Sequence, residues 1–81
     1  MRHRVVIEQP ALLETPEVVL EEAASRFKEM AAGFDRISPE SIFWASARVS
    51  RLCLIVQGWA FMYELDAETL RVTEVRRPRF R

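Results

Sequence analysis

The chain has 81 residues, of which 49% are hydrophobic and 30% charged, and its formal net charge is zero. This balance is typical of a folded globular protein and excludes a disordered chain, and no apolar stretch is long enough to span a bilayer. A chain of this length forms one hydrophobic core, so we expect a single domain over residues 1–81 and no membrane association.

The N-terminus and the cysteine content indicate the compartment. The first residues lack the long apolar segment and small-residue cleavage site of a secretory signal. Cys53 is the only cysteine, which excludes a disulfide within the chain. We therefore expect a cytoplasmic protein. Because the neighbours of Cys53 are apolar, its thiol is expected to be buried, unreactive packing.

The first half of the chain predicts a strand and a long helix. Residues 2–8 show the alternation of a strand, which Pro10 ends. Thr15-Pro16-Glu17 is typical of a helix start, with Thr15 as the capping residue and an acid near the positive end of the helix dipole. The helix is expected to run to Ala32 and to end at Gly33. Its apolar stripe, which should pack on the sheet, consists of Leu20, Ala23, Ala24, Phe27, Met30 and Ala31.

Residues 39–49 have two interpretations. Ser38-Pro39-Glu40 repeats the pattern of cap, proline and acid, and Ile42, Ala45, Val49 and Leu52 have helical spacing. This favours a second, shorter helix. The same segment also contains β-branched and aromatic residues that suit an additional strand, and periodicity alone does not separate the two.

The C-terminal part predicts three antiparallel strands. Residues 52–56 are apolar on both faces, which is typical of an interior strand, and Gln57-Gly58 forms the turn that follows. From Trp59 to Asp66 the two faces differ, which indicates a half-buried strand. A third strand begins at Leu70, and a break in its alternation predicts a bulge near Thr73-Glu74.

These elements predict a small α+β domain. A strand and two helices precede a three-strand antiparallel meander, and the helices pack on one face of the sheet.

Most side chains that could take part in catalysis or ligand binding are expected to have structural roles instead. His3 has no second histidine or cysteine nearby, so a frayed terminal position is expected. Trp44, Trp59 and Tyr63 are expected to be packing aromatics, and Glu64 and Asp66 are expected to be solvated charges. The sequence indicates no catalytic group, no metal site and no cofactor.

Arginine dominates the basic residues and is concentrated near the C-terminus. Lys28 is the only lysine among the 12 basic residues. The planar guanidinium suits phosphate or carboxylate groups, so the bias favours recognition of an anion or an acidic partner, although genomic codon bias explains it equally well. The predicted binding residues, expected along one margin of the sheet, are Arg51, Arg71, Arg76, Arg77 and Arg79.

The order of elements and the C-terminal strands resemble the RelE/ParE toxin superfamily. From Arg51 to Asp66 the chain has a basic residue, alternating apolar positions, a glycine at the turn, an aromatic residue, and an apolar run that ends in tyrosine and acids. Residues 70–79, where apolar alternation gives way to basic residues, are similar to the last strand of the family. The resemblance is clear over residues 51–80 and thematic over the first half.

The resemblance implies two activities. RelE-type members cleave messenger RNA on the ribosome and need clustered cations to stabilise the phosphate. Arg51 matches one such position and Arg77 or Arg79 another, but Ala60 and Cys53 stand where those nucleases have basic residues. No tyrosine or histidine follows the last strand. ParE-type members keep the fold without this set and act on DNA gyrase, which fits this chain better.

We therefore expect a toxin of a toxin–antitoxin system that binds a macromolecular target, ParE-like and directed at DNA gyrase, and that is not an enzyme. The expected partner is an antitoxin or another protein, a homodimer is a further option, and nucleic acid is not favoured. The alternatives are a ribosome-dependent mRNA endonuclease of RelE type and a non-catalytic interaction module, such as an adaptor or a phage-type inhibitor.

Overall fold

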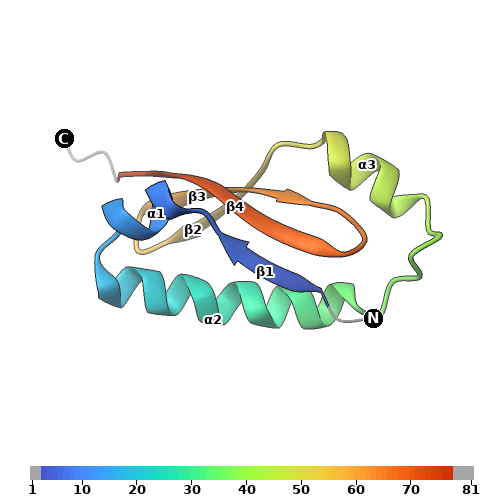
Figure 1. Cartoon of the computed structure of the whole chain (residues 1–81), viewed down its shortest axis with the longest axis horizontal. Helices are drawn as coiled ribbons and strands as arrows, with labels where there is room; N and C mark the ends of the chain where they lie inside the picture. The colour runs from blue at the N-terminus through green and yellow to red at the C-terminus, as the bar shows by residue number, and fades with distance from the viewer. Residues whose placement is uncertain (1–2, 78–81) are drawn as a thin grey trace.

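The computed structural model describes residues 3–77, which form an α+β domain (Figure 1). Helix α2 runs along the length of the sheet, while α1 and α3 lie near its two ends (Figure 1). Within the described residues no helix is both long and apolar enough to cross a membrane. In chain order the elements are β1 (Arg4–Ile7), α1 (Gln9–Glu14), α2 (Glu17–Phe34), α3 (Phe43–Val49), β2 (Leu52–Val56), β3 (Trp59–Leu65) and β4 (Thr69–Arg76).

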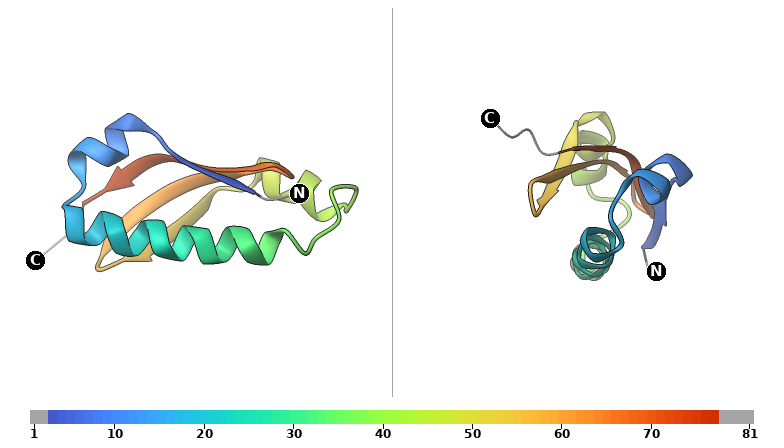
Figure 2. Two further views of the ribbon diagram at one scale, coloured as in Figure 1. Left: turned by 60° about the horizontal axis from the view of Figure 1, so that its bottom comes forward. Right: turned by 90° about the vertical axis from the view of Figure 1, so that its left-hand side faces the viewer.

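The sheet has four strands in the order β1-β4-β3-β2. Strands β2, β3 and β4 form the predicted antiparallel meander, and β1 pairs with β4 in parallel, with Val5 opposite Leu70 and Ile7 opposite Val72. Beyond the end of β1, helix α1 packs beside β4, and Ala11 is fully buried there (Figure 2). Helix α1 thus lies beside the second half of β4, which extends beyond the end of β1.

Helix α1 was not predicted, and it changes the role of two residues. Strand β1 ends before Pro10, but the proline also lies in the first turn of α1, where its missing N–H costs no helical hydrogen bond. Thr15 follows the end of α1, and its hydroxyl donates to the carbonyl of Ala11 at 2.6 Å. The prediction that Thr15 caps the next helix is therefore wrong. Pro16 precedes that helix, and no side chain caps it.

Helix α2 ends two residues later than predicted. It continues through Gly33 to Phe34, and Asp35 still has helical backbone angles. Gly33 was expected to end the helix but lies inside it, since the backbone does not enter the left-handed region that would favour glycine. The cap is formed instead by the N–H of Asp35, which donates to the carbonyl of Ala31 at 3.0 Å.

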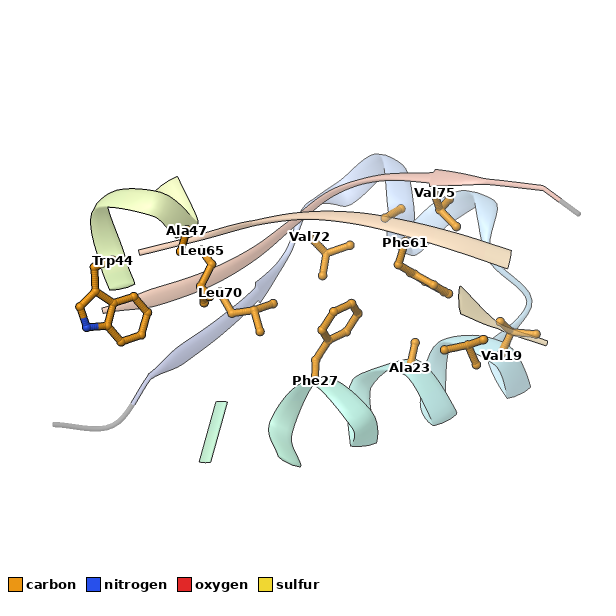
Figure 3. Close-up of a cluster of buried hydrophobic side chains, with 12 residues drawn as sticks. Val19, Ala23, Phe27, Trp44, Ala47, Phe61, Leu65, Leu70, Val72 and Val75 are labelled. Carbon is orange, nitrogen blue, oxygen red and sulfur yellow. The ribbon is translucent and has the colours of Figure 1, made fainter. Parts of the chain in front are cut away.

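The core lies between α2 and the inner face of the sheet. The predicted stripe is confirmed at Ala23, Phe27 and Ala31, which are buried, and Val19 extends it toward the start of the helix. The ring of Phe27 meets Phe61 edge to face, with centroids 6.1 Å apart (Figure 3). It meets Tyr63 in the same way, with centroids 5.3 Å apart. Each fully buried large side chain contributes about 1.5–3 kcal/mol through removal from water. The strand residues that complete this core include Val56, Leu65, Leu70, Val72 and Val75.

Residues 43–49 form the helix that the sequence favours over a strand. The helix begins at Phe43, with Ile42 at its N-cap, and not after Ser38. The side chain of Ser41 accepts from the N–H of Phe43 at 3.2 Å. Its buried residues are Trp44 and Ala47, and the indole of Trp44 donates to the carbonyl of Ser38 at 2.8 Å. The tryptophan side chain thus determines which face of the helix is buried.

The apolar residues whose spacing favoured the helix do not form its buried face. Ile42 and Val49 are 86% and 85% exposed. Helical spacing correctly indicated the type of element, but it did not identify the buried face.

Strand β2 is an edge strand, not the interior strand that its apolar residues predicted. Among the described strands, β3 is its sole neighbour, and Cys53 and Ile55 are exposed on the face opposite α2. Cys53 is therefore exposed, not buried packing. The turn prediction is confirmed, because Gln57 and Gly58 have φ values of 51° and 84° and join the strands through a two-residue connection of type I′.

The predicted bulge is confirmed at Thr73. Met62 of β3 lies opposite Glu74, whereas the next residue, Tyr63, lies opposite Val72. Thr73 is thus the extra residue on β4. As a result, Val72 and Val75 both face the core although they are separated by an odd number of positions.

Candidate binding surface

The sheet has an inner face, covered by α2, and an outer face that α3 approaches near one end (Figure 2). Side chains alternate between these faces along each strand. The strand register therefore assigns the outer face, which consists of Arg4 and Val6 on β1, Thr69, Arg71, Glu74 and Arg76 on β4, Ala60, Met62 and Glu64 on β3, and Cys53 and Ile55 on β2.

The outer face is apolar on one side and charged on the other. On the β2 side Cys53 lies opposite Met62, and Ile55, which is 61% exposed, lies opposite Ala60. We call these four residues the apolar patch. The neighbouring β4 positions carry charges instead. Apolar area beside guanidinium groups is common at protein-binding surfaces.

The structure separates the predicted binding arginines into two groups. Arg51 directly precedes β2 at the end of the sheet near α3, and Arg71 lies at the same end, opposite Glu64. Arg76 and Arg77 lie at the other end of β4.

The separation corrects the predicted arrangement. Arg71 and Arg76 are about 16 Å apart along the strand, so the expectation of one continuous arginine margin is wrong. Arg79 lies outside the described residues.

The group near α3 lines two adjoining hollows. One, of about 100 Å³, is lined by Arg48, Glu64 and Arg71 among others, and the second, of about 210 Å³, by Arg48, Arg51 and Glu64 among others. We call Arg48, Arg51, Glu64 and Arg71 the arginine hollow. Arg48 was not predicted as a binding residue. It lies in the last turn of α3 and faces the sheet, an arrangement that depends on the tertiary structure.

Acidic side chains offset much of the charge on this face. Arg71 lies 3.7 Å from Glu8, and Arg76 lies 3.5 Å from Glu74. These pairs are exposed, so each contributes little to stability. Glu64 adds a carboxylate to the arginine hollow itself. Mixed charge of this kind suits a protein partner better than a nucleic-acid backbone, which attracts an excess of cations.

Tyr63 lies beside the hollow with its ring packed against Phe27. Burial raises the pKa of its hydroxyl above 10.0, and the nearby Cys53 adds to this shift. The phenol therefore stays neutral at physiological pH. Its expected packing role is confirmed, as are those of Trp44, which is buried, and Trp59, which packs on the core.

His3 is anchored, and the expectation of a frayed position is wrong. Its Nδ1 lies 2.7 Å from the Asp35 carboxylate and its Nε2 lies 2.9 Å from the backbone carbonyl of Asp66. Its ring also stacks on Trp44, with centroids 5.0 Å apart. No sequence signal indicated this cluster, because its partners come from three separate segments of the chain.

Asp66 belongs to the turn between β3 and β4. It is exposed, as predicted, but its side chain is not free, because it accepts from the N–H groups of Glu68 and Thr69 at 2.8 and 2.7 Å. Glu64 is also exposed, as predicted.

In the segment from residue 3 to residue 77, no three His, Cys, Asp or Glu side chains are placed to hold a metal ion. No protein-family model, curated protein or solved structure matches the chain. The chemistry of the outer face is therefore the basis for inferring a function.

Proposed function

We propose that this protein is a toxin-like module that inhibits a macromolecular target by binding it, as ParE-type members of the RelE/ParE superfamily do. DNA gyrase is the first target to test. The observation that carries the proposal is the outer face of the sheet, where the exposed apolar patch lies beside the arginine hollow. The cognate partner would be an antitoxin that covers this face.

The composition of the outer face supports binding of a protein. Arginine and large apolar residues contribute most of the energy at protein interfaces, particularly where an apolar centre has a polar rim. Ile55 and Met62 supply the apolar centre, and Arg51 and Arg71 lie at its rim. A target with acidic side chains around an apolar cleft would complement this arrangement.

RNA cleavage is the second candidate, because the arginine hollow places Arg48 and Arg51 near Glu64. Such a set contains cations for a phosphate and a carboxylate that accepts a proton. The carboxylates that offset the arginines weigh against it. The neutral net charge of the chain does so too, since it gives no general attraction toward RNA.

Induced expression tests the proposal. We expect slower growth of the host, inhibition of DNA supercoiling by the purified protein, and intact transcripts. The double variant Arg48→Ala/Arg51→Ala should relieve the growth defect, since both side chains are exposed and their removal leaves the core intact. Arg26→Ala, an exposed arginine on α2, is the matched control and should remain toxic.

The outcomes separate the candidates. Toxicity with intact transcripts supports binding, and failure to inhibit supercoiling in that case rejects gyrase but not the binding mode. Transcripts cleaved in the wild type and spared in the double variant would establish the nuclease instead. Normal growth at verified levels of folded protein would reject both hypotheses, the binding toxin and the ribonuclease.

A further inference from the structure

We propose that a second copy of this chain pairs with the free edge of β2, so that two sheets join into one continuous antiparallel sheet about a two-fold axis at Leu54. This inference rests on the geometry of the edge and does not depend on the proposed function. It assigns the apolar patch a role in self-association.

The backbone of β2 offers unpaired hydrogen-bonding groups. Val56 and Trp59 close the two-residue turn, so they form a hydrogen-bonded pair, and such pairs recur at every second position along an antiparallel ladder. Leu54 and Leu52 therefore bond to β3, while the N–H and C=O groups of Cys53 and Ile55 point away from it. Neither residue has another backbone partner within the part of the chain that the structure describes.

This edge lacks the charge, proline and bulge that usually prevent pairing. Edge strands are normally protected by charge, proline, a bulge or short length. Between Leu52 and Val56 there is no charge and no proline, and the β2–β3 register is unbroken. The opposite edge is different, because β1 has only 4 residues, starts with the exposed Arg4 and is followed at once by α1.

The side chains of β2 are complementary to themselves when the axis passes through Leu54. With Leu54 on the axis, Cys53 of one copy lies opposite Ile55 of the other, and Leu52 lies opposite Val56. This register uses the free backbone groups of Cys53 and Ile55 and covers Ile55, which is 61% exposed. Shifting the axis to Cys53 would place Ile55 opposite Arg51, which pairs an apolar side chain with a cation.

Charge also favours a second copy as the occupant. The edge of β2 is uncharged and therefore does not attract a strongly charged partner. The two-fold axis places each Arg51 opposite Gln57 of the other copy, so the two arginines do not face each other. The net charge of the chain is zero, so copies do not repel one another overall.

Disulfide mapping tests the register. In a hydrogen-bonded antiparallel pair the Cα atoms are about 5.5 Å apart, which a disulfide spans, whereas diagonal neighbours are about 7–8 Å apart, which it does not. The wild type carries Cys53, and the variant Cys53→Ser/Ile55→Cys carries the partner position. Both positions are exposed, so folding should be preserved.

Under mild oxidation, a mixture of these two proteins should form disulfide dimers predominantly between unlike chains. Each protein alone should form few. Equal crosslinking in the mixture and in each protein alone, or none in the mixture, overturns the proposed register and with it the proposal.

Sedimentation equilibrium tests the association itself. We expect a reversible monomer–dimer equilibrium that Ile55→Lys weakens by about tenfold or more, because it places one lysine in each of the two apolar Cys53–Ile55 pairs. Val18→Lys is the matched control, since Val18 is 68% exposed but lies on α2, and it should dimerise like the wild type. A wild type that stays monomeric up to its solubility limit, or equal weakening by both variants, overturns the proposal and leaves the edge to an extended segment of another protein.

Discussion

One carboxylate oxygen of Asp35 holds both the backbone and the ring of His3, although the two residues are 32 positions apart. The backbone N–H of His3 donates to Oδ1 at 2.6 Å, and the ring Nδ1 lies 2.7 Å from the same atom. With Nε2 on the Asp66 carbonyl, the histidine joins the start of β1, the end of α2 and the β3–β4 turn. Both ring nitrogens thus lie within hydrogen-bonding distance of an oxygen atom.

Asp35 should stabilise the fold near neutral pH, and this stabilisation should be lost in acid. The hydrogen bond from the His3 ring lowers the pKa of Asp35 below 3.8, the ordinary value. A carboxyl with a lowered pKa in the folded state stabilises the fold above its unfolded pKa, and this contribution disappears as the pH falls through the folded value. Asp35→Asn should therefore unfold more easily than the wild type near neutral pH.

The difference between the two proteins should shrink below about pH 3.8. Urea unfolding at a series of pH values measures it. A constant difference across the series would show that Asp35 acts through packing and not through its charge.

Phe27→Ala should be among the most destabilising single substitutions. Phe27 is fully buried and meets both Phe61 and Tyr63. Its removal leaves a cavity and should cost about 3–5 kcal/mol, a large part of the roughly 4–12 kcal/mol expected for a domain of this size. Denaturant unfolding measures the loss. The exposed neighbour Lys28→Ala should change stability by less than about 0.5 kcal/mol, and an equal loss in both variants would contradict the placement of the core.

The two glycines should respond to alanine with opposite signs. Gly33 lies inside α2, and a Cβ added there meets nothing within 4 Å, so Gly33→Ala should stabilise by about 0.5–1 kcal/mol. Gly58 has a φ of 84° in the β2–β3 turn, and alanine there should cost about 1–2 kcal/mol through backbone strain. Thermal unfolding of both variants checks this. Destabilisation by Gly33→Ala would mean that the helix does not continue through this position.

The sequence predicted the elements with strong local signals and missed those that depend on contacts between distant segments. Gln57-Gly58 and the Thr73 bulge were recognised because turn chemistry and strand phase are local properties. The exposed face of β2 was missed because a run of apolar residues does not distinguish a central strand from an edge strand. The buried face of α3 was missed for a similar reason, since Trp44 competes with Ile42 and Val49 and only the fold decides between them.

The candidate surface was predictable only in part. Arg51 and Arg71 lie at the same end of the sheet, but they are distant in sequence, and Arg48 joins them only because α3 folds back beside β3. His3 gave no signal, because its anchoring requires Asp35, Trp44 and Asp66 together.

Thr73 determines which way the end of β4 faces. Strict alternation from Leu70 would turn Glu74 and Arg76 toward Phe27 and its neighbours and would leave Val75 in water. The single inserted residue reverses this, so that Val75 is 8% exposed and the charged pair faces outward. The bulge at Thr73 therefore avoids the burial of two charged side chains. It places Val75 in the core and leaves Glu74 and Arg76 in contact with water.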